Sequence, residues 1–528
     1  MSDVALASRT GRFVVAAAVL GSGMALLDGT VVNVALVRMG DELHASMADL
    51  QWITNGYLLA LASLILLGGS LGDLYGRRRI FVIGVTWFTL ASAACGLAQS
   101  PGQLVVARVL QGVGGALLTP GSLAMIQGSF RPDDRGKAIG AWSGLGGVAS
   151  AIGPFVGGWL VQFASWRWAF LVNVPLGVVT VWIAQRHVPE TRNPQADHRF
   201  DVPGALLATL SLGTVTLALI QHEALGPARA VLVGALGLLL GGAFVVVERR
   251  SAHPMVPPSL FRSRQFSAAN AMTLLVYAAL GAVFFFLTLQ LQTVLGYGPL
   301  QAGLASLPVT VLMLLLAARG GELASRIGPR LPMTVGPVVC GVGTLLLAGV
   351  GAGSSYWSGV LPGITVFGLG LTLLVAPLTA TVLAAAPDRY AGVASGVNNA
   401  VARAGSLLAV AALPAVVGLS GSDYAVPAAF SAGYRTAMLL CAVLLVAGGI
   451  VSWLLIRNPV REAAPEGEEV ERVPGAGTPA GGPPSPEHDV TSALGSATRR
   501  TTPAGWSCAG SEGCPGTVVR SEDTAQDR

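Results

Sequence analysis

The chain has 528 residues, of which 52% are hydrophobic and only 11% are charged, and its formal net charge is +5. Soluble domains carry about 25% charged residues, so this composition excludes an ordinary soluble protein and indicates one that lies mostly in a bilayer. The basic residues lie between apolar runs rather than on one soluble face, which argues against a nucleic-acid partner.

Apolar windows of about 20 residues, each long enough to cross the hydrocarbon core as a helix, occur fourteen times along the chain. We therefore predict an all-α polytopic membrane protein with fourteen transmembrane helices. The predicted spans are residues 13–37, 52–72, 80–98, 103–127, 138–163, 168–186, 203–221, 228–247, 268–292, 301–318, 331–351, 358–384, 393–418 and 434–456. No A-x-A-like site ends the first span, so we predict that it is retained rather than cleaved as a signal peptide.

The basic residues are distributed unequally between the loops. Loops after even-numbered spans hold most of them, namely Arg77, Arg78, Arg79, Arg131, Arg135, Lys137, Arg186, Arg192, Arg199, Arg249, Arg250, Arg262, Arg264, Arg326, Arg330 and Arg389. Loops after odd-numbered spans hold only Arg38, Arg167, Arg229 and Arg435. The positive-inside rule therefore predicts a plasma-membrane protein with both termini cytoplasmic. Residues 457–528 are rich in Pro, Gly, Ser, Glu and Arg, which predicts a disordered cytoplasmic tail.

One acid, Asp28, lies near the middle of the first span. A charged side chain at that depth costs on the order of 2.5–3.5 kcal/mol, so such a residue is expected to have a function. Burial favours its neutral form and a nearby arginine favours the carboxylate, and a group poised between these states can load and release a proton. The alternative is a carboxyl group that only hydrogen-bonds a neighbouring helix.

Further patterns occur at defined places along the spans. The loop after the second span has the sequence G-S-L-G-D-L-Y-G-R-R-R from Gly69, in which the glycines permit a tight turn. The fourth span opens with L-V-V-A-R-V-L-Q-G from Leu104, and the fifth contains G-P-F-V-G-G from Gly153. The sixth begins with W-R-W-A-F-L-V-N-V-P-L-G from Trp166.

Together with L-D-G-T-V-V-N-V-A-L from Leu27, these stretches resemble the motifs of the major facilitator superfamily, and more narrowly of its 14-helix drug:proton antiporter branch. The loop matches G-x-L-x-D-x-x-G-R-[RK], and the other stretches match motifs of helices 1, 4, 5 and 6 in the expected order. The resemblance covers residues 13–456. Val37 stands where the helix-1 motif usually has proline, and Ala149 stands where glycine is common.

The resemblance implies two six-helix bundles that are repeats of each other, with two linker helices inserted between them. This gives an N-terminal segment at residues 1–12, a first bundle at 13–190, the linker helices at 200–250 and a second bundle at 265–456. Residues 321–330 form a degenerate copy of the loop after the second span, as two related halves would have.

The resemblance also implies roles for single residues. Helix arithmetic places Asp28 about 12 Å and Arg108 about 8 Å from the same membrane surface, so the two are predicted to pair and to couple transport to protons. The alternative for Arg108 is to reach toward the headgroups. The predicted conformational latch is Gly69, Asp73, Gly76, Arg77 and Arg78, whose alternative is a charge cluster that only fixes topology. The predicted antiporter motif is Gly153, Pro154, Gly157 and Gly158.

Polar and aromatic side chains within the spans suit an amphipathic pocket. The predicted substrate contacts are Asn33, Asn55, Tyr57, Gln111, Trp142, Asn173, Tyr277, Gln290 and Asn398. Asp28 is the one acid found in a span interior, and a dication would need two buried negative charges. We therefore predict a neutral, weakly charged or monocationic organic substrate.

These patterns predict a proton-coupled antiporter that exports hydrophobic or monocationic drugs or antibiotics by alternating access. It is predicted to act as a monomer on a small molecule and protons, without nucleic acid, cofactor, metal or enzymatic activity. No G-x-x-x-x-G-K-[ST] stretch supports a motor ATPase. Open alternatives are an exporter of one endogenous antibiotic or metabolite, a proton-linked nutrient importer, and a non-transporting membrane sensor or enzyme.

Overall fold

The computed structural model describes residues 4–192, 201–387, 390–421 and 423–458, and that part of the chain is helical, without strands. One compact unit holds Met1–Val460. The predicted tail from residue 459 onward lies outside the described residues, as do Arg199 and Arg389.

Thirteen helices within the described residues are long and apolar enough to cross a membrane, which confirms the all-helical membrane architecture. The helix α5 (Pro132–Phe163) has 32 residues and covers the predicted span 138–163. Helices therefore lie at every predicted span, while the number of fourteen crossings stays a prediction.

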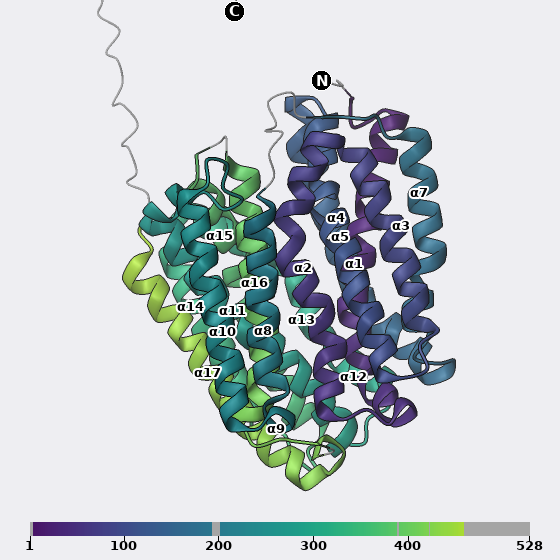
Figure 1. Cartoon of the computed structure of the whole chain (residues 1–528), viewed down its shortest axis with the longest axis vertical. Helices are drawn as coiled ribbons and strands as arrows, with labels where there is room; N and C mark the ends of the chain where they lie inside the picture. Colours follow the sequence, from purple (N-terminus) through teal and green to yellow (C-terminus); the bar gives the residue numbers. More distant parts are fainter. Residues whose placement is uncertain (1–3, 193–200, 388–389, 422, 459–528) are drawn as a thin grey trace, which may run out of the picture. The chain divides into compact units, whose positions relative to one another are not determined.

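The first half of the chain forms a bundle in which α2, α3 and α4 pack side by side and α1 packs against α4, α5 and α7 (Figure 1). Its other helices are α1 (Arg9–Leu43), α2 (Met47–Tyr75), α3 (Arg77–Gly96), α4 (Pro101–Ser129), α6 (Trp168–Leu171) and α7 (Asn173–His187). The sixth predicted span is interrupted at Val172, because Pro175 has no N–H to offer the carbonyl of Leu171.

The second half forms a second bundle, in which α14 packs against α15 and α17, and α11 packs against α16 and α17. Its helices are α11 (Arg264–Leu289), α12 (Pro299–Ala305), α13 (Leu307–Ile327), α14 (Arg330–Leu347), α15 (Leu361–Ala384), α16 (Ala391–Val416) and α17 (Pro427–Leu455). The tenth predicted span is broken at Ser306, two residues before Pro308, by the same loss of a donor.

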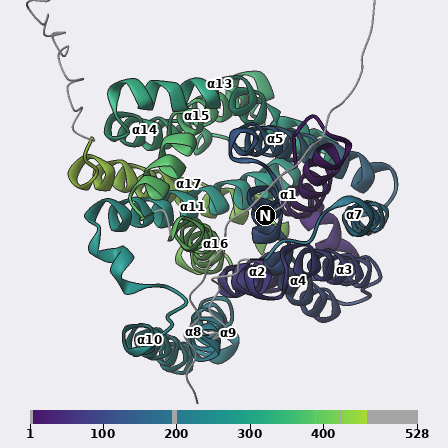
Figure 2. The ribbon, with the colours of Figure 1, turned by 90° about the horizontal axis from the view of Figure 1, so that it is seen from above.

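Two linker helices connect the bundles. The helix α8 (Val202–Ile220) packs against α2 of the first bundle and α16 of the second, whereas α10 (Pro227–Arg250) packs mainly against α8, as Figure 2 shows. Asp201 caps α8 by accepting a hydrogen bond from the Gly204 amide at 2.8 Å. Glu248, near the end of α10, is 4% exposed and accepts one from the Val256 amide at 3.0 Å.

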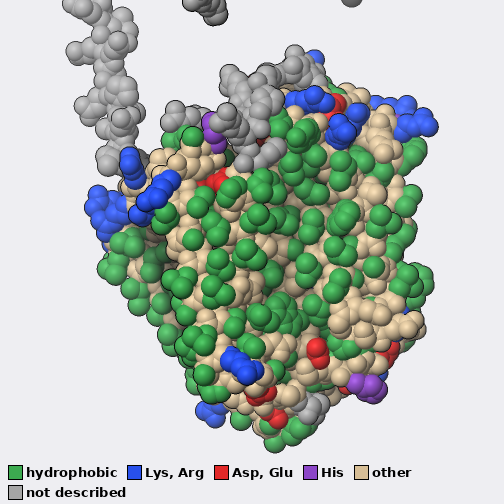
Figure 3. Space-filling view, in the orientation of Figure 1, with side chains coloured by type: hydrophobic (Ala, Val, Ile, Leu, Met, Phe, Trp, Pro, Cys, Tyr) green, Lys and Arg blue, Asp and Glu red, His purple; other side chains and the backbone are tan. Residues whose placement is uncertain are grey.

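On the face seen in Figure 3, a broad band of hydrophobic side chains lies between two charged rims. We call the rim at which α1 begins and α17 ends the terminal face, and the rim at which α1 ends and α17 begins the distal face. Lys and Arg gather at the terminal face in this view, as they do in the loops there. The band supplies the apolar surface that a bilayer requires.

Hydrogen bonds join the two bundles at the distal face. Gln51 donates to the carbonyls of Val410 and Ala411 at 2.8 and 3.0 Å. The Met47 amide donates to the Gly421 carbonyl at 2.8 Å, and the Tyr424 hydroxyl donates to the Ala45 carbonyl at 2.8 Å. Gln292 donates to the Val34 carbonyl at 2.9 Å, and the Leu300 amide donates to Gln162 Oε1 at 3.2 Å. Burial, with the nearby charges of Asp41 and Asp49, raises the pKa of Tyr424 and keeps it a donor.

Closer to the terminal face, a Cβ atom added at Gly396 of α16 would contact Leu66 of α2, so the two bundles touch there as well. The hydrogen bonds that join the bundles within the described residues lie toward the distal face. Hydrogen bonds thus hold the described bundles together mainly at the distal face.

Candidate functional site

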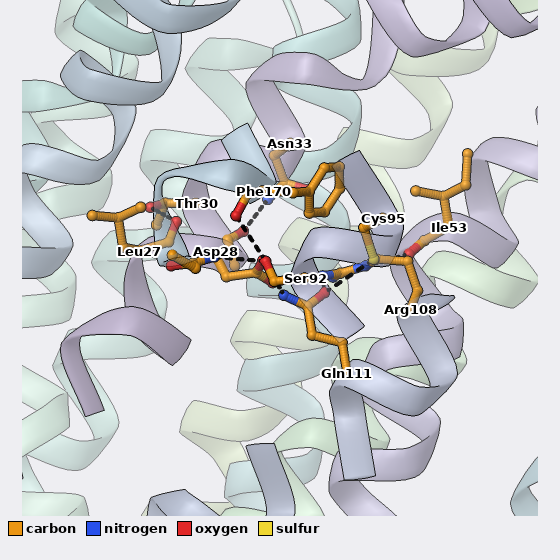
Figure 4. A network of polar contacts seen from close by, with 12 residues as sticks. Leu27, Asp28, Thr30, Asn33, Ile53, Ser92, Cys95, Arg108, Gln111 and Phe170 are labelled. Atoms are coloured by element: carbon orange, nitrogen blue, oxygen red, sulfur yellow. Dashed lines mark hydrogen bonds and ion pairs between the residues drawn. The ribbon is translucent and has the colours of Figure 1, made fainter. Parts of the chain in front are cut away.

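A buried ion pair joins α1 to α4 inside the first bundle. Asp28 is fully buried, Arg108 is 2% exposed, and Arg108 Nη1 lies 2.6 Å from Asp28 Oδ2 (Figure 4). Either charge alone at this depth would be costly, and the two side chains compensate each other. Arg108 therefore does not reach toward the membrane surface, which was the alternative for its position.

Gln111, one turn after Arg108 on α4, completes the pair. Its Nε2 donates to Asp28 Oδ1 at 2.8 Å, and its Oε1 accepts from Arg108 Nη1 at 2.6 Å. Arg108 Nε donates to the carbonyl of Ile53 on α2 at 3.0 Å. Each carboxylate oxygen of Asp28 thus has a donor, so the ionised pair is held by hydrogen bonds as well as by charge.

A second layer of polar groups holds Gln111. It also donates to Ser92 Oγ on α3 at 3.2 Å, and Asn173 Nδ2 on α7 donates to the same oxygen at 3.1 Å. Ser92 Oγ in turn donates to the carbonyl of Phe170 at 2.9 Å. The site thereby draws on six helices of the first bundle, so a shift of any one of them changes the geometry of the pair.

Aromatic rings cover the guanidinium. The Arg108 Cζ atom lies 4.4 Å from the ring centre of Tyr57 and 5.7 Å from that of Phe170, within the range of cation–π contacts. Tyr57 is only 3% exposed. The rings exclude water from the pair and strengthen its electrostatic interaction.

One face of α1 next to Asp28 is open. Leu26 is 36% exposed, Gly29 is exposed and Asn33 is half-buried, and their spacing places them on one side of the helix. A Cβ atom added at Gly29 would meet no atom within 4 Å. Asp28 is therefore followed directly by a residue, Gly29, that faces open space.

The residues predicted as substrate contacts fall into three groups. Gln111, Tyr57 and Asn173 belong to the Asp28 network. Hydrogen bonds to other segments hold Trp142 to Ser22 at 2.8 Å, Gln290 to the Val350 carbonyl at 2.9 Å, and Asn398 to Thr273 at 2.7 Å. The remaining three are the half-buried Asn33 and Tyr277 and the fully buried Asn55, whose amide atoms have no hydrogen-bond partner among the described residues. Contact with a substrate stays a prediction for all nine.

The predicted latch lies at the terminal face, where Gly69 precedes Asp73 by one turn on α2. Gly76, with φ of +113°, makes the turn that glycine favours. Asp73 pairs with Arg77 at 2.8 Å, and Arg77 also donates to the Ala124 carbonyl of α4 at 3.1 Å. Arg78 lies 3.6 Å from Glu190. These contacts stay within the first bundle, so a latch between bundles remains a prediction about another conformation.

The predicted antiporter motif lies between the bundles on α5. A Cβ atom at Gly157 would lie 2.7 Å from Val31 of α1, and one at Gly153 would clash with the side chain of Thr30. On the other side, a Cβ atom at Gly158 would lie 2.7 Å from Leu300 Cα of α12, and the Pro154 carbonyl lies against Gly303. Small residues here let one helix touch both halves of the molecule.

The family model described as Major Facilitator Superfamily matches residues 18–410. The chain belongs to the Major Facilitator Superfamily. Membership confirms the family predicted from the motifs, and it makes the chain a multi-pass membrane protein related to transporters.

Relatives within the Major Facilitator Superfamily include named export and resistance proteins. The chain is 37% identical to the tetracenomycin C resistance and export protein of Streptomyces glaucescens, over 75% of this chain and 74% of that protein. It is 36% identical to the cephamycin export protein CmcT of Amycolatopsis lactamdurans, over 86% and 96%. It is 35% identical to the multidrug resistance protein Stp of Mycobacterium tuberculosis strain CDC 1551 / Oshkosh, over 78% and 76%.

Solved structures show the same fold. A bacterial homologue of the human lysosomal transporter Spinster, in an inward-facing and unoccupied conformation, matches with a TM-score of 0.61 and 17% identity, over 85% of this chain and 97% of that one. The inward-open xylose transporter XylE from E. coli matches with a TM-score of 0.57 and 13% identity, over 85% and 97%. Among the described residues no cluster of three His, Cys, Asp or Glu could hold a metal ion.

The contacts of several residues in this superfamily member could be identified only from the structure. Glu190 accepts hydrogen bonds from the Arg78 and Arg79 amides at 3.0 and 3.2 Å, although it lies more than 100 residues away. Ser92 links α3 to the Asp28 network and has no signal in the sequence beyond being polar within a span. Glu248 is a buried acid beside Arg249 and Arg250, where it resembles an ordinary charged helix end.

Proposed function

We propose that the chain exports a small hydrophobic molecule, an antibiotic or drug, from the cell in exchange for protons. The observation that carries this proposal is the buried Asp28–Arg108–Gln111 network, because it holds a titratable carboxyl group in a span beside an open helix face. The names of the relatives support export and resistance as its context.

The proposed orientation places the terminal face in the cytoplasm. Arginines crowd the loops of that face, as the positive-inside rule requires. The distal face is then the outer one, and the hydrogen bonds that join the bundles there close the path to the outside. The described conformation is accordingly one that receives substrate from the cytoplasm or the inner leaflet.

The proposed cycle uses Asp28 as the proton carrier. With Asp28 ionised, Arg108 and Gln111 are held to it and the first bundle keeps its present packing. Protonation removes the negative charge, weakens the ion pair and frees the guanidinium, so α1 and α4 can move relative to each other. Because α1, α2 and α5 all contact the second bundle, this movement reaches the interface at which the halves rock.

One proton supplies enough energy for useful export. A charge crossing the membrane yields about 2.3 kcal/mol per 100 mV, hence about 3.5 kcal/mol at roughly 150 mV. At about 1.4 kcal/mol per decade, this sustains about a 300-fold gradient of a neutral solute. A second titrating acid is therefore not required for coupling.

The test is the variant Asp28→Asn, which keeps the shape of the side chain but cannot carry a proton. Inside-out vesicles from expressing cells would receive pyrenebutyrate, its methyl ester or pyrenebutylammonium, which share one ring system and differ in charge. The wild type should accumulate at least one probe when the lumen is acidic, and Asp28→Asn should reduce this uptake to background. The matched control is Glu322→Gln, an acid in an exposed ion pair of the second bundle.

The protein level in the membrane is measured in parallel, because Asp28→Asn leaves Arg108 without its counter-charge. Uptake by Asp28→Asn that still responds to collapse of the pH gradient by nigericin would contradict the coupling role. Accumulation in right-side-out vesicles, driven by an inward proton gradient, would instead identify a nutrient importer. Whether the cargo is one endogenous antibiotic or many drugs is a property that the same panel, extended to antibiotics, measures directly.

A further inference from the structure

A second arginine lies deep in the membrane region, in the other bundle. Arg403 is near the middle of α16, about 18 Å along the helix axis from its first residue and about 20 Å from its last. An arginine side chain cannot reach a headgroup region from that depth, so snorkelling does not explain it. Its charge must be accommodated inside the protein.

The described residues offer Arg403 no counter-charge. Among the described residues, the acid near this depth is Asp28, and its carboxylate is already bound by Arg108 and Gln111. The hydrogen bond that the structure gives Arg403 is a long one, from its Nε to Asn399 Oδ1 on its own helix at 3.4 Å. In the part of the chain that the structure describes, no carboxylate forms an ion pair with Arg403.

Arg403 lies between the two bundles. Gly396 of α16 lies against Leu66 of α2, and Val410 accepts a hydrogen bond from Gln51 of α2, so Arg403, seven residues from each, lies on the face of α16 that adjoins α2, where Tyr57 falls between Gln51 and Leu66. On the side of the second bundle, Ser406, one turn after Arg403, donates to the Tyr277 carbonyl of α11 at 2.8 Å. The side chain is half-buried, as is Tyr277. The guanidinium is therefore placed at the interface where an alternating-access transporter binds its cargo.

The charges of this central region do not balance. The Tyr57 ring covers the Arg108 guanidinium at 4.4 Å, and Tyr57 lies on the stretch of α2 that adjoins α16 around Arg403. Among the described residues this region holds two guanidinium groups and one carboxylate, and protonation of Asp28 would remove that negative charge. A cationic cargo would meet repulsion here, whereas an anionic group would supply the missing charge and accept the planar donors of an arginine.

We propose that Arg403 binds an acidic group of the exported molecule, a carboxylate or an ionised phenol or enol, with Tyr57 and Tyr277 against its apolar body. The proposal rests on the proposed export function and names the substrate class of the same site. It differs from the sequence-based expectation of a neutral or monocationic cargo, which counted the acids of the spans and did not count Arg403.

An anionic cargo also changes the electrical cost of transport. Outward movement of a monoanion in exchange for one inward proton carries two positive charges inward in net terms. A neutral cargo carries one and a monocation carries none. The membrane potential of a cell, negative inside, therefore drives export of the anion more strongly than that of the other two.

The test compares three pyrene probes on the purified protein in lipid nanodiscs, with probe anisotropy as the readout. Wild type should bind pyrenebutyrate more tightly than its methyl ester, and the methyl ester more tightly than pyrenebutylammonium. Arg403→Gln should weaken binding of pyrenebutyrate by about 10- to 100-fold, the value of hydrogen bonds to a charged group, and leave the ester unchanged. Arg403→Lys should keep part of the preference, and Arg435→Gln, an exposed arginine of α17, should keep all of it.

Each result bears on the proposal. Equal binding of the three probes to the wild type, or an unchanged preference in Arg403→Gln, would overturn it. The wild-type ranking requires no variant, so poor folding of Arg403→Gln cannot hide the answer. If the wild type binds pyrenebutyrate through Arg403 but no pH gradient moves any probe in vesicles, the proposed antiport fails while this binding site stands.

Discussion

Gln111 is the residue on which the geometry of the buried pair depends. Its amide donates to Asp28 and to Ser92 and accepts from Arg108, so one fully buried side chain connects α1, α3 and α4. An amide can serve both a carboxylate and a guanidinium because it carries a donor and an acceptor. No apolar side chain of similar size can replace it in that role.

Replacing Gln111 by leucine should therefore destabilise the protein by about 1–3 kcal/mol, the cost of leaving buried polar partners without a hydrogen bond. We expect a lower midpoint in a thermal assay that follows the monodisperse protein by size-exclusion chromatography. The matched change on the same helix, Gln127→Leu, affects an exposed side chain and should leave the midpoint nearly unchanged. Equal midpoints for Gln111→Leu and wild type would show that the amide does not hold the pair.

For a single residue, the sequence predicts its depth in the membrane but not the residues that it contacts. Helix arithmetic places Asp28 and Arg108 at similar levels, and the structure brings them into contact. The spacing of Gln111 from Arg108 shows that they share a helix face, but it does not show that Gln111 faces Asp28 rather than a cargo. The sequence places Arg403 in the thirteenth span as a gate or a packing residue, but the prediction of the cargo counted acids alone. Glu190 was missed because its contact crosses more than 100 residues.

The helix α5 packs closely against helices of both bundles. Its Gly153 and Gly157 lie against α1, while Gly158 lies against the backbone of α12 in the other bundle. The hydropathy pattern predicts a span beginning at residue 138, whereas the helix begins at Pro132. Hydropathy marks the hydrocarbon core, and a helix continues past that boundary as long as its backbone hydrogen bonds remain satisfied.

Gly158→Ala should impair closure of the distal face. The added methyl group would lie 2.7 and 2.8 Å from backbone atoms of Leu300 and Pro299, which cannot move as a flexible side chain would. Overpacking of this kind costs about 1–3 kcal/mol, so the population closed at that face should fall about 5- to 100-fold relative to the open one. We expect reduced uptake of pyrene probes and stronger labelling of a cysteine placed at Gln162.

The control for this change lies on the same helix. A Cβ atom at Gly144 would meet no atom within 4 Å, so Gly144→Ala should transport normally. If Gly158→Ala also transports and labels like the wild type, the contact with α12 does not limit closure.

At the scale of the whole molecule, two bundles touch through pairs of helices. The resemblance predicts this architecture, and repeated halves account for it. The sequence does not indicate which conformation is seen, because the same residues must form both a state closed at the distal face and a state closed at the terminal face. The distal hydrogen bonds between Gln51 and α16, or between Gln292 and α1, are products of tertiary packing and have no local signal.

A reversible cross-link at the distal face should stop transport. Gln162→Cys and Leu300→Cys, with Cys508 and Cys514 replaced by serine, place two accessible thiols on α5 and α12, where the native residues form a hydrogen bond of 3.2 Å. Treatment with a bifunctional methanethiosulfonate should abolish uptake but preserve binding of pyrene probes, and dithiothreitol should restore uptake. Gln162→Cys alone should be insensitive. Full activity of the cross-linked protein would mean that these helices need not separate.

The two linker helices cover one of the two junctions between the bundles. The helix α8 lies along both α2 and α16 and covers the junction between them, while α10 packs on the outer side of α8. Among the described residues no helix covers the opposite junction in this way, where α5 meets α13, and large apolar side chains such as Phe155 and Leu315 are exposed on those two helices. In the proposed export cycle, a compound dissolved in the inner leaflet would therefore approach the interior from the side of α5 and α13.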